Sequence, residues 1–185
     1  LSNSAVEVAR TIAIARRRLD LDALVEVSPL DEDEVMAALD ELVEADIVVE
    51  HRTDEGEEVE LSQQRFRDVL LEPLDAEDRR ARHRDLGEVL ERLFRHRPGV
   101  VVEQLTWHFE RAGVSTKAYA YLVQTARRHL ANSLYDEALG FLERALAAEN
   151  RARPFTVLDQ ADRQLCEVLL ARSQCRYHLG QWPKA

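Results

Sequence analysis

The fold of the first part of this chain is decided by the stretch Asp31-Glu-Asp-Glu-Val-Met-Ala-Ala-Leu-Asp-Glu-Leu-Val43. Asp31 is followed three residues later by Glu34, which is the spacing of a capping box at the start of a helix. The apolar residues recur at helical spacing and fall on one stripe: Val35, Met36, Leu39, Leu42 and Val43. The other face is almost entirely carboxylate. The stretch therefore predicts an amphipathic helix with a strongly acidic outer face.

Two helices are expected before this stretch, over residues 3–18 and 20–26, where apolar residues again recur at helical spacing. After it, residues 47–49 form a β-prone run, and a polar turn separates them from residues 59–61, the expected returning strand. Three helices followed by a small hairpin is the order of a winged helix. We therefore assign residues 1–74 to a winged-helix-like domain.

From Asp75 onward the pattern predicts helices alone. Asp75 is the expected N-cap of a long helix, and residues 75–97 are assigned as a linking helix that Pro98-Gly99 ends. Later helices are expected over residues 100–112, 115–132, 133–150 and 156–179, with Ser115, Ser133 and Thr156 opening the last three and Gly180 closing the last. The predicted fold class is all-α with a small β-hairpin wing.

One segment of the second half, Ser133-Leu-Tyr-Asp-Glu-Ala-Leu-Gly-Phe-Leu-Glu-Arg-Ala-Leu146, resembles the second helix of a tetratricopeptide (TPR) repeat. The resemblance implies that Ala138 is a small residue at a close helix crossing, with Ala126 as its counterpart on the first helix. Residues 98–185 are accordingly assigned to a TPR-like array of antiparallel helical hairpins. A second partial match starts at Leu179 and stops inside a helix, so the array is expected to be truncated and to self-associate through its C-terminal helix.

The order of these parts along the chain also resembles that of a known class of larger proteins. A winged helix, a linking helix, the segment His108-Phe-Glu-Arg-Ala-Gly113 and TPR-like hairpins resemble one segment of large bacterial signalling proteins. Those proteins contain a signal-transducing (STAND) ATPase and often a serine/threonine kinase. The resemblance implies a cytoplasmic, non-catalytic interaction and regulatory segment. Its expected partners are a protein or peptide ligand and adjacent domains of the same full-length chain.

Three residues are singled out by the same resemblance. Arg127, Gln174 and Tyr177 fall at first-helix positions that line the concave groove of TPR repeats. An arginine beside amide and phenol groups can hold a carboxylate or an acidic peptide. The resemblance therefore implies a peptide-binding site at these residues, and the alternative is that they are ordinary exposed side chains.

A nucleic-acid-binding regulator is the alternative function, through the winged helix or an Arg-rich helix. The Arg-rich helix contains Arg79, Arg80, Arg82, Arg84, Arg92, Arg95 and Arg97. The net charge of −10 is unevenly spread, because residues 20–60 contain 17 acids and one base. The expected recognition helix, residues 31–46, has eight acids and no Lys or Arg. Since duplex binding depends on neutralising phosphates, we expect no nucleic-acid partner.

A stand-alone enzyme is the third hypothesis, and no motif supports it. None of the six histidines pairs with another His or Cys at a metal-ligand spacing, and neither a P-loop motif nor HExxH is present. Cys166 and Cys175 lie nine residues apart on one expected helix, on opposite faces. No catalytic, metal-binding or cofactor-binding residue is therefore expected, and no membrane partner, because no apolar run is long enough to span a bilayer.

Overall fold

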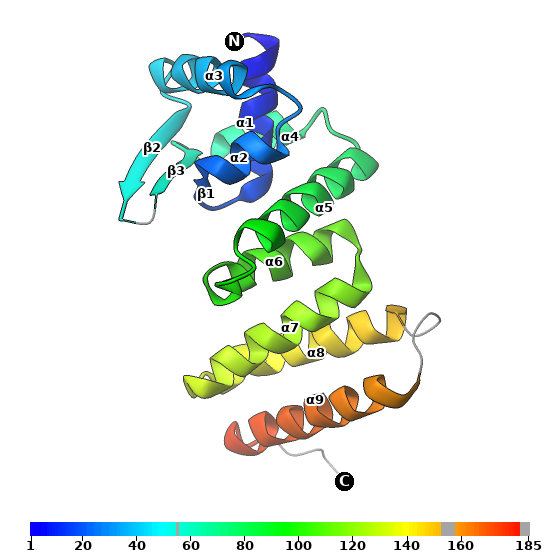
Figure 1. Ribbon diagram of the computed structural model, residues 1–185. Coiled ribbons are helices and arrows are strands. Elements are labelled where there is room, and N and C mark those ends of the chain that lie inside the picture. The colour runs from blue at the N-terminus through cyan, green and yellow to red at the C-terminus, as the bar shows by residue number, and fades with distance from the viewer. Residues whose placement is uncertain (55, 153–157, 182–185) are drawn as a thin grey trace. The chain divides into compact units, whose positions relative to one another are not determined.

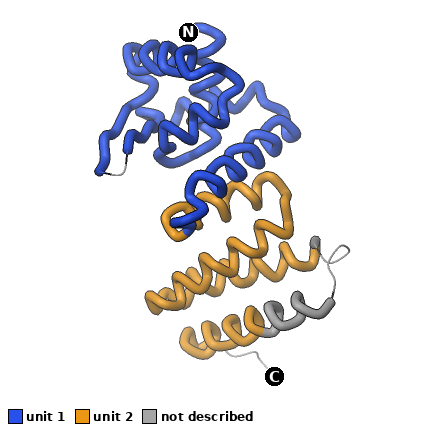
Figure 2. The backbone as a smooth tube through the Cα atoms, in the orientation of Figure 1, with its two compact units in different colours: residues 1–98 blue, residues 99–185 orange. Residues whose placement is uncertain are grey.

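The computed structural model describes residues 1–54, 56–152 and 158–181, with side chains described outside 152–166. These residues form a mostly helical chain with a small antiparallel sheet, which confirms the predicted class at that level (Figure 1). The chain divides into two compact units, Leu1–Pro98 and Gly99–Ala185 (Figure 2). Each unit is described by itself below. None of the described helices combines the length and apolar character that a membrane crossing requires.

The first unit places three short strands among its helices. Its elements are α1 (Asn3–Ala15), β1 (Leu19–Asp20), α2 (Leu21–Val27), α3 (Glu32–Glu44), β2 (Val48–Thr53), β3 (Gly56–Leu61), α4 (Arg65–Leu71) and α5 (Ala76–Leu93). The strand order in the antiparallel sheet is β1-β3-β2. Most of the segment 75–97 forms α5, which packs against α1 and α2.

Side-chain caps fix where these helices begin. The predicted capping box of α3 is confirmed: Glu34 N donates to Asp31 Oδ1 at 2.9 Å, and Asp31 N donates to Glu34 Oε2 at 3.2 Å. Asp75 caps α5 as predicted, accepting from the backbone N–H of the second and third helical residues. The first helix ends at Ala15, earlier than the predicted residue 18. Arg16 there adopts a left-handed φ of 64°, which stops the helix and redirects the chain into β1.

The hairpin is longer than the sequence pattern predicted. Pairing runs from Val48 opposite Leu61 to Thr53 opposite Gly56, so most of the expected polar turn, residues 51–58, is strand instead. The strand β1, which pairs Leu19 with Val59, was not predicted. The physical reason is that Leu19, Val48 and Val59 are buried while most of their strand neighbours are polar and partly or fully exposed. Backbone pairing, rather than apolar content, extends these strands.

The core of the first unit is centred on α1, which packs against α3, α4 and α5. Its buried apolar residues are Ala5, Val8, Ala9, Ile12, Ala13, Ile14, Leu24, Val35, Ala38, Leu39, Leu42, Val48, Val59, Leu86, Val89 and Leu90, among others. Arg67 of α4 closes the end of α1 by donating to the carbonyls of Ala13 at 3.0 Å and Arg16 at 2.9 Å. The acidic face of α3 is left outside this core.

The second unit consists, in its described residues, of helices alone. They are α6 (Pro98–Ala112), α7 (Ser115–Ala131), α8 (Tyr135–Ala152) and α9 (Leu158–His178). The short turn between α7 and α8 folds them into an antiparallel pair, and α9 packs on α8 (Figure 1). Small residues lie fully buried within this packing: Ala126, Thr125, Ala138, Ala145 and Ala148.

Left-handed residues follow the ends of α6, α7 and α9. Gly113, Ser133 and Gly180 have φ of 73°, 59° and 65°. After Gly180, Gln181 N donates to Arg176 O at 2.8 Å, which confirms the predicted C′ position. Ser133 was predicted to open α8 but instead ends α7, where the next backbone N–H donates to His129 O at 2.9 Å.

The other two predicted N-caps of this unit have different outcomes. Ser115 is the first residue of α7 rather than its cap, and no side chain caps that helix. The predicted cap Thr156 lies outside the described residues. The spacing of apolar residues located the helices, whereas it did not locate their first residues.

Candidate functional site

The three residues implied by the TPR resemblance lie on two helices of the second unit. Arg127 is in the second half of α7, and Gln174 and Tyr177 are in the last turns of α9. All three side chains are exposed. Each is therefore accessible to a binding partner. The contacts that Arg127 and Tyr177 make within the unit differ, as described next.

Arg127 is paired across the helices. Its Nη2 lies 2.5 Å from Oε2 of Glu167 on α9, and the two side chains are 60% and 61% exposed. An ion pair this exposed contributes only about 0–1 kcal/mol to stability. A carboxylate from another molecule can therefore replace Glu167 at the guanidinium with little loss of folding stability.

Tyr119, on the same helix as Arg127, adds a polar group with unmet hydrogen-bonding capacity. Its hydroxyl oxygen is buried and has no hydrogen-bond partner among the described residues. Burial raises the pKa of Tyr119, the charges of Glu149 and Glu167 raise it further, and the charge of Arg127 opposes them. The phenol is thus neutral and able to donate. Because an unmade buried hydrogen bond costs about 1–3 kcal/mol, a ligand that uncovers this hydroxyl and accepts its hydrogen bond gains binding free energy from it.

Tyr177 belongs to an aromatic group at the other end of α9. Its ring meets the ring of His178 edge to face, with centroids 5.6 Å apart, and His178 stacks on Tyr135 of α8 at 4.3 Å. Tyr177 itself is 63% exposed. It offers an apolar face supported by rings from two helices.

The structure does not gather the three predicted residues at one point. Tyr177 lies ten residues after Glu167, the partner of Arg127, so the two ends are roughly 15 Å apart along α9. An extended peptide of about five residues spans that distance, and Gln174 lies between the ends. The arrangement suits a peptide lying along the helices rather than a small molecule.

Three residues of this region were missed by the sequence analysis: Tyr119, Glu149 and Glu167. Tyr119 is eight residues before Arg127 on one helix, which places it on a neighbouring row of the helix surface. Glu167 is 40 residues from Arg127, and nothing in its local sequence marks it. The cross-helix ion pair depends on how α7 and α9 are placed, and one sequence does not contain that information.

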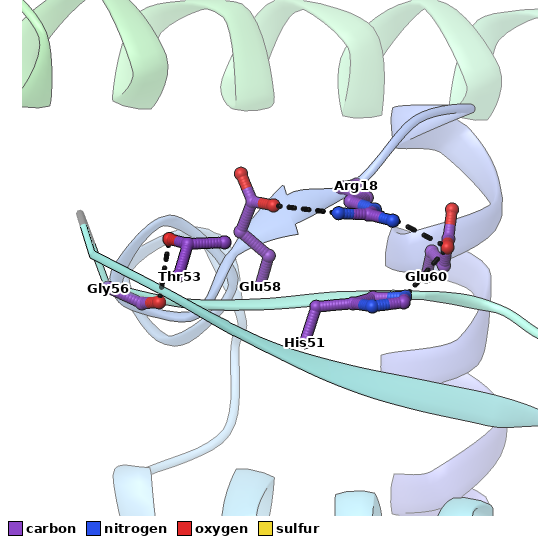
Figure 3. Close-up of polar contacts among 6 residues, drawn as sticks. All are labelled: Arg18, His51, Thr53, Gly56, Glu58 and Glu60. Atoms are coloured by element: carbon purple, nitrogen blue, oxygen red, sulfur yellow. Dashed lines mark hydrogen bonds and ion pairs between the residues drawn. The ribbon is translucent and has the colours of Figure 1, made fainter.

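A second polar group lies on the small sheet of the first unit (Figure 3). Arg18 Nε lies 3.4 Å from Glu60 Oε1 and its Nη1 lies 3.9 Å from Glu58 Oε2. His51 Nε2 contacts the same Glu60 oxygen at 2.7 Å. Arg18 and His51 therefore both contact carboxylates of β3.

Most of the predicted Arg-rich helix is α5, which ends at Leu93, before Arg95 and Arg97. Several of its arginines have structural partners. Arg79 donates to the carbonyl oxygens of Leu71, the last residue of α4, and of Leu74 just after it. Arg82 pairs with Glu7 of α1, and Arg92 pairs with Glu26 of α2. These three arginines tie α5 to the rest of the unit and are not available as a set to contact phosphates.

We expect the chain to show no salt-sensitive, sequence-specific binding to duplex DNA. The exposed acids of α3 repel phosphates, and the arginines just described are engaged within the unit. A gel-shift titration at near-physiological salt checks this, with an unrelated basic DNA-binding protein as positive control. A shift at submicromolar protein that is abolished by substitutions on α3 contradicts it.

The described side chains give no sign of a metal site, because no three His, Cys, Asp or Glu groups among them gather closely enough to hold an ion. Cys175 is buried, and burial raises the pKa of its thiol, so its reactive thiolate form is disfavoured. The side chain of Cys166 lies outside the described residues.

Comparisons with family models, with curated proteins and with solved structures give no match. The functional argument therefore depends on the geometry and chemistry of the side chains described above.

Proposed function

We propose that this chain is a non-catalytic protein–protein interaction and regulatory segment of a larger bacterial signalling ATPase or kinase. In this proposal α7, α8 and α9 form TPR-like hairpins that receive a protein or peptide. The observation that carries it is the exposed Arg127–Glu167 pair beside the hydroxyl of Tyr119, which has no hydrogen-bond partner among the described residues. Arg127 can exchange Glu167 for a ligand carboxylate, and the Tyr119 hydroxyl can gain a hydrogen bond to the ligand.

Support for TPR-like hairpins comes from the residues at the contact of α7 with α8. The repeat resemblance places small residues at Ala126 and Ala138, and both side chains are fully buried. Small buried side chains allow the backbones of two helices to approach closely. The antiparallel pair with a short turn is the geometry that such a hairpin requires.

The groups on α7 and α9 suit a peptide with a carboxylate. Arg127 would exchange Glu167 for the ligand carboxylate, and a guanidinium can bind it through two parallel hydrogen bonds. Tyr119 would donate its O–H to a second ligand oxygen. Gln174 would bond the peptide backbone further along α9, and the ring of Tyr177 would cover an apolar side chain.

The first unit would serve as a regulatory contact in this proposal. It resembles a winged helix in its order of elements, and its α3 begins with Glu32, Asp33 and Glu34 beyond the cap. That acidic surface suits a basic protein surface in an adjacent domain of the same chain better than it suits a nucleic acid. Binding at the second unit would then be relayed to the catalytic parts of the full-length protein.

An array of random 12-residue peptides, divided into acidic and neutral pools, tests the proposed site. We expect the chain to retain acidic peptides in preference to neutral ones. For the peptides retained, fluorescence anisotropy should show that Arg127→Ala weakens binding about tenfold or more, because a charge-assisted pair is lost. Tyr119→Phe should weaken the same peptides by a smaller factor.

The matched control for this experiment is Arg151→Ala, since Arg151 is an exposed arginine in the last turn of α8. It removes the same charge from the same unit without touching the site. Retention of no peptide, or equal loss of binding in both arginine variants, contradicts the proposal.

Self-association through the C-terminal helix stays a prediction. Among its described side chains, α9 exposes Leu169, Leu170 and Tyr177 at 36%, 66% and 63%. We expect light scattering at high protein concentration to show a dimer or larger species, and Leu170→Glu to shift it toward monomer. A chain that is monomeric at every concentration contradicts the prediction.

A further inference from the structure

The first unit contains a pocket whose lining includes no residue of the acidic helix α3 or of the sheet. It has a volume of about 290 Å³ and lies where α5 packs against α1 and the end of α2. Its apolar walls come from all three segments and include Ile14, Val27, Pro29 and Leu86. The volume is just below the roughly 300–1,000 Å³ of small-molecule sites. The pocket therefore suits a group of side-chain size rather than a nucleotide or a folded element.

The polar groups around this pocket are mainly carboxylates. Glu7, Asp78 and Asp85 line it together with one cation, Arg82. Glu7 is already engaged, because Arg82 Nη1 lies 2.6 Å from its Oε1 and Arg10 Nη1 lies 3.9 Å from its Oε2. With three carboxylates and one guanidinium, the lining carries a formal charge of −2.

The two remaining carboxylates are available to a ligand. Asp78 and Asp85 lie seven residues apart on α5, which is two turns, and both are exposed. Neither carboxylate forms an ion pair or a charge-assisted hydrogen bond within the described part of the chain. They bracket Arg82 along one face of the helix, and the apolar wall lies beside them.

We propose that this pocket binds an arginine side chain from a basic protein segment. The alkyl stem of arginine would pack on the apolar walls, and its charged end would meet Asp78 or Asp85. A guanidinium fits better than an ammonium, because it is the more weakly hydrated cation and so loses less on entering a pocket with apolar walls.

A protein segment, rather than a free small cation, follows from the charge around the pocket. Residues 20–60 of the same unit contain 17 acids and one base, so the unit carries many acids besides those that line the pocket. A ligand with further positive charges gains from that negative charge in both encounter rate and binding. The described residues supply no three-group metal cluster here that would favour an ion instead.

The test uses the full chain and the peptide acetyl-Lys-Gly-Arg-Gly-Lys-amide, followed by ¹H–¹⁵N NMR. We expect saturable shifts in residues 7–14 of α1 and 78–86 of α5. The same peptide with citrulline for arginine keeps the shape, loses the charge at that position, and should bind about tenfold more weakly. The variant Asp78→Asn/Asp85→Asn should weaken the arginine peptide by a similar factor.

Two controls make the result decisive. Glu77→Gln removes a neighbouring exposed carboxylate of α5 that does not line the pocket, and it should leave the affinity unchanged. Agmatine, a free alkyl guanidinium, should bind more weakly than the peptide. Absence of shifts in these segments, equal binding of the citrulline peptide, equal loss in Glu77→Gln, or agmatine binding as tightly as the peptide would each overturn the proposal.

Discussion

Replacing Leu142 by alanine should lower the free energy of unfolding of the second unit by about 2–5 kcal/mol. Leu142 is 1% exposed and lies on α8, the helix that packs against both α7 and α9. The substitution removes buried apolar surface and leaves a cavity between helices. Urea denaturation followed by tryptophan fluorescence measures this unit specifically, because both tryptophans, Trp107 and Trp182, lie in residues 99–185.

The control for this prediction is Leu134→Ala, a leucine in the turn before α8 that is 42% exposed. It should cost clearly less, since much of its side chain remains in water in the folded state. If the two variants are equally stable, α8 is not the centre of the packing that we describe.

Replacing Ala138 by leucine should also destabilise the second unit, by about 1–3 kcal/mol. Ala138 is fully buried on α8, where that helix packs on α7. A larger side chain there has to push the two helices apart or adopt a strained rotamer. The same urea experiment measures the effect, together with a fall in melting temperature.

Ala147→Leu is the matched control for this variant, because Ala147 is an exposed alanine of the same helix. It adds the same atoms where there is room for them, so the change in stability should be small. An unchanged urea midpoint for Ala138→Leu would show that Ala138 does not lie at a close helix crossing.

The helices of this chain could be predicted from apolar periodicity and caps. Asp31 with Glu34, and Asp75, mark helix starts in the sequence and cap them in the structure. Such signals are local, since a cap bonds backbone groups within three residues of itself. Gly180 at the end of α9 was predictable for the same reason, because glycine favours the left-handed conformation there.

The small sheet was only partly predictable. β1 has two residues and is held by pairing with β3, some 40 residues later, so its own composition carries little signal. Ser133 was predicted as a helix N-cap because serine is common at that position, whereas here it occupies a left-handed position that ends α7. In both cases the neighbouring chain overrides the local preference.

The candidate site was predictable at Arg127, Gln174 and Tyr177 only through the repeat resemblance. Its electrostatic partners were not, because Glu149 and Glu167 come from other helices and meet α7 only after folding. The pocket lined by Asp78 and Asp85 could not be predicted either, because its lining residues also meet only after folding. In the sequence, the most conspicuous feature of this helix is its arginines. Which residues of α5 line the pocket depends on how α5 packs against α1 and α2.

The central claim is that α7 and α9 receive a protein or peptide, and hydrogen–deuterium exchange tests it most directly. The chain would be compared alone and with an acidic 12-residue peptide retained by the array. We predict slower exchange in the second half of α7 and in α9 from residue 167 onward, and loss of this protection in Arg127→Ala. Protection confined to residues 1–98, or no protection anywhere at saturating peptide, would contradict the account.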